Sequence, residues 1–308
     1  MECAKCRYVR KAVEDAPDWQ CPSCGAAYNK TGGVAQPKRG ATPSRSGRTF
    51  KNIRIFILML ILFFVAADAW LTRMRSSDWD RALWVVVYPI AAEPHVDVKE
   101  YIPSLSAEGF SDIERFMAAQ GAHYGLSLSE PIEIDIAPPI ADMPPLPPHD
   151  GGVLEVIVWS LRLRYWAMVS DSYDGPKPNI RVFVLYHRAE EGRRLAHSTG
   201  LQKGMISLVH AFADRALEQK NNVVIAHEIL HTLGATDKYD LNTGLPYYPL
   251  GYADAGQQPL FPQRRAELMA ARIPVSKIEA RMPSSLNEVV IGKATALEIG
   301  WLDIDDVP

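Results

Sequence analysis

The sequence predicts an α+β domain over residues 81–308, preceded by a small metal-binding module and one apolar helix. Three observations support this organisation. Segments typical of strands and of helices follow one another between residues 83 and 299. All four cysteines lie within the first 24 residues, and an apolar run from 55 to 67 separates them from the rest. At 308 residues the chain is long enough for about two domains.

The composition is that of a globular chain. Hydrophobic residues make up 47% of it and charged residues 22%. The formal net charge of -3 argues against a protein that binds nucleic acid, so we expect no nucleic-acid partner. No cysteine follows Cys24, and the large C-terminal part therefore cannot form disulfides.

Residues 1–30 carry two Cys-x-x-Cys pairs separated by fourteen residues. Four thiolates at this spacing suit a closed tetrahedral site, which can hold a small unit together without a large core. The stretch Asp18–Gly25 resembles a zinc-ribbon knuckle, and the short gap between the pairs favours zinc over iron. A docking site for a cytoplasmic partner and a pair of disulfides are the alternatives. We expect one structural zinc, held by Cys3, Cys6, Cys21 and Cys24.

Residues 53–71 are predicted to form a single transmembrane helix between two linkers, 31–52 and 72–80. Nineteen helical residues span roughly 28 Å, enough for the hydrocarbon core of a bilayer. The first linker is basic, and the positive-inside rule therefore places it in the cytoplasm and residues 81–308 outside. A cleaved signal peptide ending near Ala67-Asp68-Ala69 is the alternative. The expected location is the cell membrane.

Hydrophobic periodicity predicts the elements of the domain as far as residue 209. A helix should begin at Ser111 with a capping box completed by Glu114. Six prolines make residues 138–148 an irregular loop, and the apolar segment 153–169 is compatible with a helix or a long strand. The predicted strands are Leu83–Ile90, Ile132–Ile136, Arg181–Tyr186 and Met205–Val209.

The segment after these strands contains the pattern H-E-x-x-H. Its apolar residues predict a buried helix that begins at Asn221-Asn222 and ends at Gly234. On that helix His227 and His231 lie one turn apart on the same face, so both imidazoles can bind one zinc ion. Glu228 lies beside them as a candidate general base.

The turn after the helix can bring Asp237 back to the metal as a third ligand. Asp240 and Glu267 are the alternatives, and Glu267 would make a His-His-Glu site of the thermolysin kind. The whole pattern, H-E-x-x-H-x-x-G-x-x-D, resembles the metzincin clan of zinc metallopeptidases in its snapalysin-like branch. The resemblance implies that Met269, in the stretch Ala266–Ala270, is the Met-turn residue beneath the ligands; a core methionine is the alternative.

The resemblance also implies a fold. It comprises a mixed twisted sheet, the active-site helix, the Met-turn and a C-terminal helix, here over Asn287–Ile299. In that clan the last strand before the helix borders the cleft and pairs with substrate, which corresponds to Gly204–His210. His197 and His210 would then lie near the substrate, unless they are ordinary surface or core residues.

The activity implied is that of a zinc-dependent endopeptidase acting on a protein or peptide. Two imidazoles and one carboxylate leave a position for water, whose proton Glu228 would take and pass to the leaving amine. The alternative is an inactive anchored protein that binds peptides or partners. Glu228 favours the enzyme, because a structural site needs no base. A loop tyrosine is expected to steady the oxyanion, the candidates being Tyr239, Tyr247, Tyr248 and Tyr252.

Overall fold

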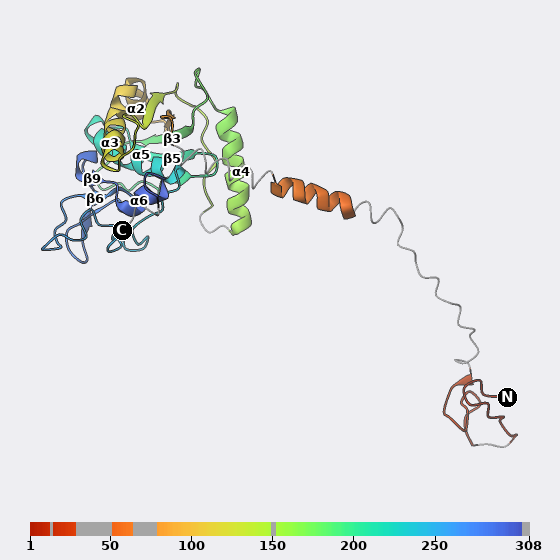
Figure 1. Cartoon of the computed structure of the whole chain (residues 1–308). Helices are drawn as coiled ribbons and strands as arrows, with labels where there is room; N and C mark the ends of the chain where they lie inside the picture. The colour runs from red at the N-terminus through yellow and green to blue at the C-terminus, as the bar shows by residue number, and fades with distance from the viewer. Residues whose placement is uncertain (13–14, 29–50, 64–78, 149–151, 304–308) are drawn as a thin grey trace. The chain divides into compact units, whose positions relative to one another are not determined.

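The computed structural model describes residues 1–12, 15–28, 51–63, 79–148 and 152–303 (Figure 1). The chain divides into two compact units, Met1–Leu62 and Phe63–Pro308, and we describe each by itself. The predicted linkers lie almost wholly outside the described residues: only residues 51–52 of the first and 79–80 of the second are included.

The prediction of a transmembrane helix is wrong. Residues 51–63 form a helix, and the remainder of the predicted segment, residues 64–71, lies outside the described residues. No helix within the described ranges combines the length and the apolar character needed to cross a bilayer. Thirteen helical residues measure about 20 Å, whereas a hydrocarbon core is about 30 Å thick. The part of the predicted segment that the structure describes, residues 53–63, is therefore too short to cross a bilayer.

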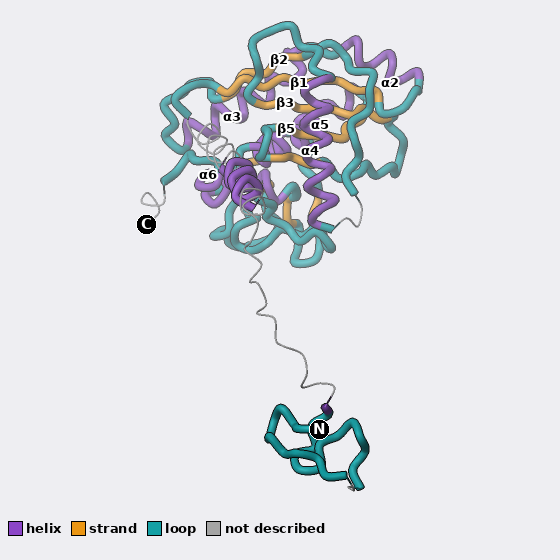
Figure 2. Tube along the Cα trace, turned by 90° about the vertical axis from the view of Figure 1, so that its right-hand side faces the viewer, coloured by secondary structure: helices purple, strands orange, loops and turns teal. Residues whose placement is uncertain are grey.

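A five-stranded mixed sheet forms the centre of the C-terminal unit, in the order β2-β1-β3-β5-β4 (Figure 2). Four strands are parallel, and β4 runs antiparallel to β5. The predicted α+β class and mixed sheet are thus confirmed, and the four predicted strands are present, although the short strand β4 was not predicted. The strands are β1 (Leu83–Ala91), β2 (Ile132–Ile136), β3 (Ile180–His187), β4 (Thr199–Leu201) and β5 (Ile206–Phe212).

Helices cover both faces of the sheet, which explains the nearly continuous apolar sequence of β1 and β3. Along β1, Val85 and Val87 point into the core shared with α3 and α5, while Val86 and Tyr88 point to α4. Figure 1 shows α4 on one side of the sheet and α3 and α5 on the other. The ambiguous segment 153–169 is thus a helix. The helices are α2 (Val96–Tyr101), α3 (Ser111–His123), α4 (Val153–Val169), α5 (Glu218–Thr232) and α6 (Lys293–Glu298).

Helix α3 begins at Ser111, as predicted, but without the predicted capping box, and α5 begins earlier than predicted. The residue that caps α3 is Phe110, and the Ser111 hydroxyl instead donates to the Glu108 carbonyl at 2.8 Å. Glu114 accepts a 2.7 Å hydrogen bond from the backbone N–H of Ile134, so it joins the helix to β2 and completes no capping box. Helix α5 begins three residues before Asn221, whose buried amide bonds the backbone of Phe212.

The predicted C-terminal helix over Asn287–Ile299 is only partly correct, because α6 covers Lys293–Glu298 alone. Val289–Val290 forms β9 and pairs in parallel with β6 (Ala266–Glu267). Two adjacent β-branched residues favour that extended pairing over a helix. A second short pair joins β7 (Ile273–Pro274) to β8 (Ala280–Arg281). Single 3-10 turns are η2 (Ile102–Ser104), η3 (Ala107–Phe110), η4 (Arg215–Leu217), η5 (Leu268–Ala270) and η6 (Leu286–Glu288).

Candidate metal centres

The first candidate centre is built by two similar turns in the N-terminal unit. The Cys3 carbonyl accepts from the N–H of Arg7, and the Cys21 carbonyl accepts from the N–H of Gly25. These turns bring the sulfurs of all four cysteines within 4.8 Å of one another. The closest sulfur pairs are 3.6 and 3.7 Å apart, and none of the four cysteines is in a disulfide. The four thiols thus form a zinc-ribbon-like cluster that could hold a metal ion.

The thiols of this cluster differ in acidity. A backbone hydrogen bond from Ala26 would lower the pKa of the Cys24 thiol, but its sulfur neighbours and burial raise it to about 12. Burial alone would raise the pKa of the Cys21 thiol, but backbone hydrogen bonds from Cys24 and Ser23 lower it to about 6. A thiol with a lowered pKa is more readily deprotonated to the thiolate that binds zinc.

The second candidate centre depends on how α5 ends. Leu233 is the last residue of helical conformation, and Gly234 follows with φ +103. The N–H of Gly234 bonds the His231 carbonyl, and the N–H of Ala235 bonds the Leu230 carbonyl at 3.0 Å. These two bonds form a Schellman motif, which reverses the chain at the end of the helix. Glycine is needed because other residues rarely adopt this backbone conformation.

The two histidines of α5 are oriented by backbone carbonyls. His227 Nδ1 lies 2.9 Å from the Leu268 carbonyl, and His231 Nδ1 lies 2.8 Å from the Ala235 carbonyl. A carbonyl can only accept, so each neutral imidazole carries its proton on Nδ1 and leaves Nε2 unprotonated. This is the arrangement that fixes a metal-binding histidine.

Asp237, the predicted third ligand, lies close to both histidines. Its Oδ1 lies 3.2 Å from Nε2 of His227 and 3.3 Å from Nε2 of His231. Burial would raise the pKa of Asp237, but in the metal-free site hydrogen bonds from the two imidazoles, when they carry a proton on Nε2, hold it below its usual range. Two nitrogens and one carboxylate oxygen therefore lie close together, and these are donor types that could hold a metal ion.

Glu228 faces the same point from within the protein. The residue is 5% exposed, and burial raises the pKa of its carboxyl group. Its Oε2 and the Oδ1 of Asp237 are buried and accept no hydrogen bond from the described residues. Buried carboxylate oxygens without a donor are rare, and a cation or a water molecule would satisfy both of these. His227, Glu228 and His231 therefore form a group that could hold a metal ion.

The other candidate ligands are engaged elsewhere. Glu267 is completely buried and accepts from the N–H groups of Ala270 and Gly292 and from the Thr295 hydroxyl, at 3.0, 3.0 and 2.7 Å. Asp240 caps its own turn by accepting from the residues that follow it. Of the three carboxylates that the sequence offered as third ligand, Asp237 is the one near both histidines.

Met269 lies in the turn that supports His227. This turn, η5, contains Leu268, the residue whose carbonyl orients His227, and it ends at Ala271 with φ 57. Met269 is fully buried, and its carbonyl accepts a 2.8 Å hydrogen bond from the N–H of Lys238. The turn therefore joins His227 to the segment that carries Asp237.

A buried ion pair next to Asp237 was not predicted. Lys238 is 4% exposed, and its Nζ lies 2.6 Å from Oε2 of Glu298 in α6. The same ammonium group donates to the carbonyl and the hydroxyl of Thr236, both at 2.8 Å. Glu298 also accepts from the N–H and the hydroxyl of Thr236. Residues 236 and 238 are thus bound to α6 on either side of Asp237.

The edge strand β4 borders the site. A Cβ atom added to Gly200 would lie 2.5 Å from Cβ of His231 and 2.7 Å from the Glu228 carbonyl oxygen, so only glycine permits this approach. The strand predicted to be the rim, 204–210, instead corresponds to β5, between β3 and β4. That prediction is wrong, because a three-residue strand containing glycine has no recognisable strand pattern.

Of the four candidate tyrosines, Tyr239 is close enough to the site for its hydroxyl group to interact with the charges of Asp237 and Glu228. Burial raises the pKa of its hydroxyl group, and the charges of Asp237 and Glu228 raise it further. Tyr248 is 62% exposed and donates to the carbonyl of Ala255, in the loop that follows.

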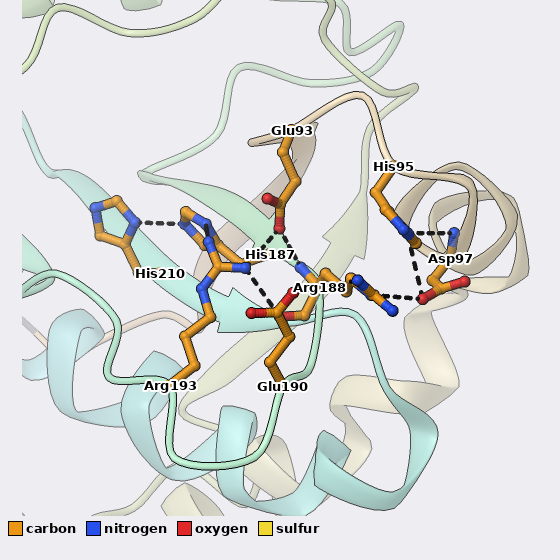
Figure 3. Close-up of polar contacts among 8 residues, drawn as sticks. All are labelled: Glu93, His95, Asp97, His187, Arg188, Glu190, Arg193 and His210. Atoms are coloured by element: carbon orange, nitrogen blue, oxygen red, sulfur yellow. Dashed lines mark hydrogen bonds and ion pairs between the residues drawn. The ribbon is translucent and has the colours of Figure 1, made fainter.

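A separate polar cluster lies at the carboxyl ends of β3 and β5 (Figure 3). His187 Nε2 and His210 Nδ1 are 2.9 Å apart, and Arg193 forms an ion pair with Glu93 beside them. Burial, His210 and Arg193 together lower the pKa of His187 to about 4. His210 is therefore held within this cluster, whereas His197 is exposed. No local motif indicated this cluster, because its members come from distant segments.

Comparison of the sequence with protein-family models and with curated proteins gives no match. The two candidate centres therefore rest on donor chemistry and geometry alone. Both sets of donors are compatible with zinc, since thiolates and imidazoles are its usual ligands.

Proposed function

We propose that the chain is a zinc-dependent endopeptidase whose active site lies at the end of α5. One observation carries the proposal: the Nε2 atoms of two imidazoles and a carboxylate oxygen converge beside a buried glutamate. This arrangement fits the metzincin resemblance of the sequence in its snapalysin-like form, with Asp237 as third ligand and Met269 in the supporting turn.

The residues fit the metal that the proposal requires. His227, His231 and Asp237 would hold zinc, and a bound cation would satisfy the Asp237 oxygen that lacks a donor. When bound, zinc lowers the pKa of a water molecule and polarises the scissile carbonyl. Three protein ligands leave room for that water, as catalytic rather than structural zinc sites do.

Glu228 acts as the general base. It takes a proton from the attacking water and later delivers it to the leaving amine. Its burial keeps competing solvent away, and the raised pKa of its carboxyl group suits a residue that must both accept and release a proton. Tyr239, whose hydroxyl group lies within electrostatic reach of the site, is our candidate for stabilising the oxyanion.

Strand β4 offers a binding surface for an extended peptide. It is the last strand of the sheet, and no other strand in the described ranges pairs with its outer edge. An extended substrate can add to such an edge through main-chain hydrogen bonds. Because Gly200 packs directly against α5, a peptide on this edge would lie close to Glu228. A polypeptide is therefore the substrate class that we propose.

The test is the variant Glu228→Gln, compared with wild type on a fluorescently labelled, unfolded protein substrate. The variant should keep its zinc and its fold, and it should lose about 10²–10⁴-fold in rate. Glu218→Gln, about three turns earlier on the same helix, is the matched control and should keep full activity.

Two results would overturn the proposal. Full activity of Glu228→Gln against a clean background would exclude Glu228 as the base. A wild-type protein that binds zinc at the histidines and cleaves none of a broad set of unfolded substrates would favour the alternative, an inactive protein that binds peptides.

A further inference from the structure

Helix α4 has two apolar faces, and only one of them is used by the fold. Trp159, Leu163 and Ala167, which are spaced at i, i+4 and i+8, are buried against the sheet. The opposite face is apolar and exposed. Its residues, with their exposed fractions, are Leu154 (77%), Ile157 (49%), Leu161 (58%), Tyr165 (65%) and Met168 (65%).

These five residues form one stripe along the outer side of the C-terminal unit, where α4 lies (Figure 1). Their spacing of three or four residues keeps them on one face, and fourteen residues of helix measure about 21 Å. Isolated exposed leucines are common, but a continuous apolar stripe usually marks a binding surface.

Basic side chains border the stripe on both sides. Arg162 lies about 100° to one side of its centre line and is exposed, and Arg164 lies about 60° to the other side and is half-buried. The Arg164 guanidinium bonds the carbonyl of Lys203, itself an exposed lysine. Within α4 the acidic residue is Glu155, in the first turn. An apolar stripe with basic borders is the pattern of helices that lie in the surface of an anionic bilayer.

We propose that α4 binds the surface of an anionic lipid bilayer, with this stripe at the boundary between headgroups and acyl chains. The helix lies flat on the lipid and does not span it, because its other face belongs to the protein core. The stripe forms a convex ridge, and a fluid bilayer surface can accommodate such a ridge without a preformed groove. A second copy of the chain fits the stripe less well. If two stripes packed against each other in antiparallel fashion, the twofold axis would pass near Leu161. The Arg162 side chains of the two copies would then lie close together, and their like charges would repel.

The experiment uses the full chain and a probe confined to α4. An environment-sensitive dye is introduced at position 161 through a non-natural amino acid, so that the four cysteines remain unlabelled. The control carries the dye at position 278, where Ile278 is 86% exposed. Vesicles of phosphatidylcholine with phosphatidylglycerol should shift the emission of the dye at 161 to the blue, and brominated lipids should quench it. Neither change should occur at 278.

Variants then test the two parts of the surface. Leu161→Glu should weaken partition of the protein into these vesicles about ten-fold, while Ile278→Glu should not. Arg162→Gln should weaken partition about five-fold into anionic vesicles and leave neutral ones unaffected. Leu161 and Arg162 are both exposed. Circular dichroism should confirm that the variants fold.

The helix over residues 51–63 is also apolar and exposed, so vesicle binding of the whole chain is not by itself support. Binding without any spectral change at position 161 would refute the proposal. A blue shift that occurs without vesicles and disappears on dilution would assign the stripe to a second copy. Equal binding to neutral and anionic vesicles would refute the role of the arginines.

Discussion

Replacement of Lys238 by methionine tests whether the buried ion pair positions the third metal ligand. The change removes hydrogen bonds of 2.6 Å to Glu298 and 2.8 Å to the carbonyl and hydroxyl of Thr236, while a side chain of similar length still fills the space. Thr236 and Lys238 adjoin Asp237 on either side. Their attachment to α6 therefore limits where the Asp237 carboxylate can lie.

The expected loss of stability follows from how deeply each member of the ion pair is buried. Removing one member of a buried ion pair typically costs about 3–5 kcal/mol, chiefly because the other charge stays unpaired. The Glu298 side chain is 29% exposed and can regain water, so Lys238→Met should cost about 2–3 kcal/mol of unfolding free energy. Glu298→Ala leaves an ammonium group that is almost completely buried and should therefore destabilise the fold more.

The assay measures two quantities for each variant. Urea unfolding of the metal-free protein gives the stability, and competition with a chelator gives the affinity of the histidine site for zinc. Lys238→Met should weaken zinc binding about 10–100-fold, as expected for a residue that orients a ligand. Lys220→Met, at an exposed lysine of α5, is the control and should change neither quantity. Unchanged zinc affinity in a destabilised Lys238→Met would refute the positioning role.

Three further predictions concern other parts of the molecule. Met269→Ala should lower stability by about 2–5 kcal/mol because Met269 is fully buried, whereas Met282→Ala, at a residue 47% exposed, should have little effect in urea unfolding. Burial and neighbouring charges lower the pKa of His187 to about 4 in the folded protein. As the pH drops from about 6.5 towards 4, His187 is therefore protonated in the unfolded chain but not in the folded one, and the free energy of unfolding should fall. A His187→Gln variant should flatten that part of the curve of melting temperature against pH. Cys21→Ser should lose the zinc of the N-terminal unit and keep peptidase activity; loss of activity would show that the two centres depend on each other.

Local sequence patterns predicted the structure correctly where a single segment of the chain determines it. The β-branched runs of β1 and β3 indicated buried strands, and the H-E-x-x-H pattern placed two imidazoles on one helical face. Gly234 indicated the reversal that brings Asp237 back to them, because few other residues can end a helix in this way.

Features that depend on distant segments could not be predicted in this way. Lys238 and Glu298 are sixty positions apart, and neither side chain indicates by itself that the pair is buried. The second apolar face of α4 hid the helical periodicity of residues 153–169, which is why they remained ambiguous. Hydropathy also predicted a bilayer-spanning helix that no helix in the described ranges matches, because it measures apolar character and not helix length.

Metal content is the most direct test of the central claim that His227, His231 and Asp237 bind a zinc ion separate from that of the cysteines. Elemental analysis of the full chain, purified with zinc and freed of excess metal, should give two equivalents, one for each candidate centre. His231→Ala should give one equivalent, retained by the cysteines. Two equivalents in that variant, or one in the wild type, would contradict the account.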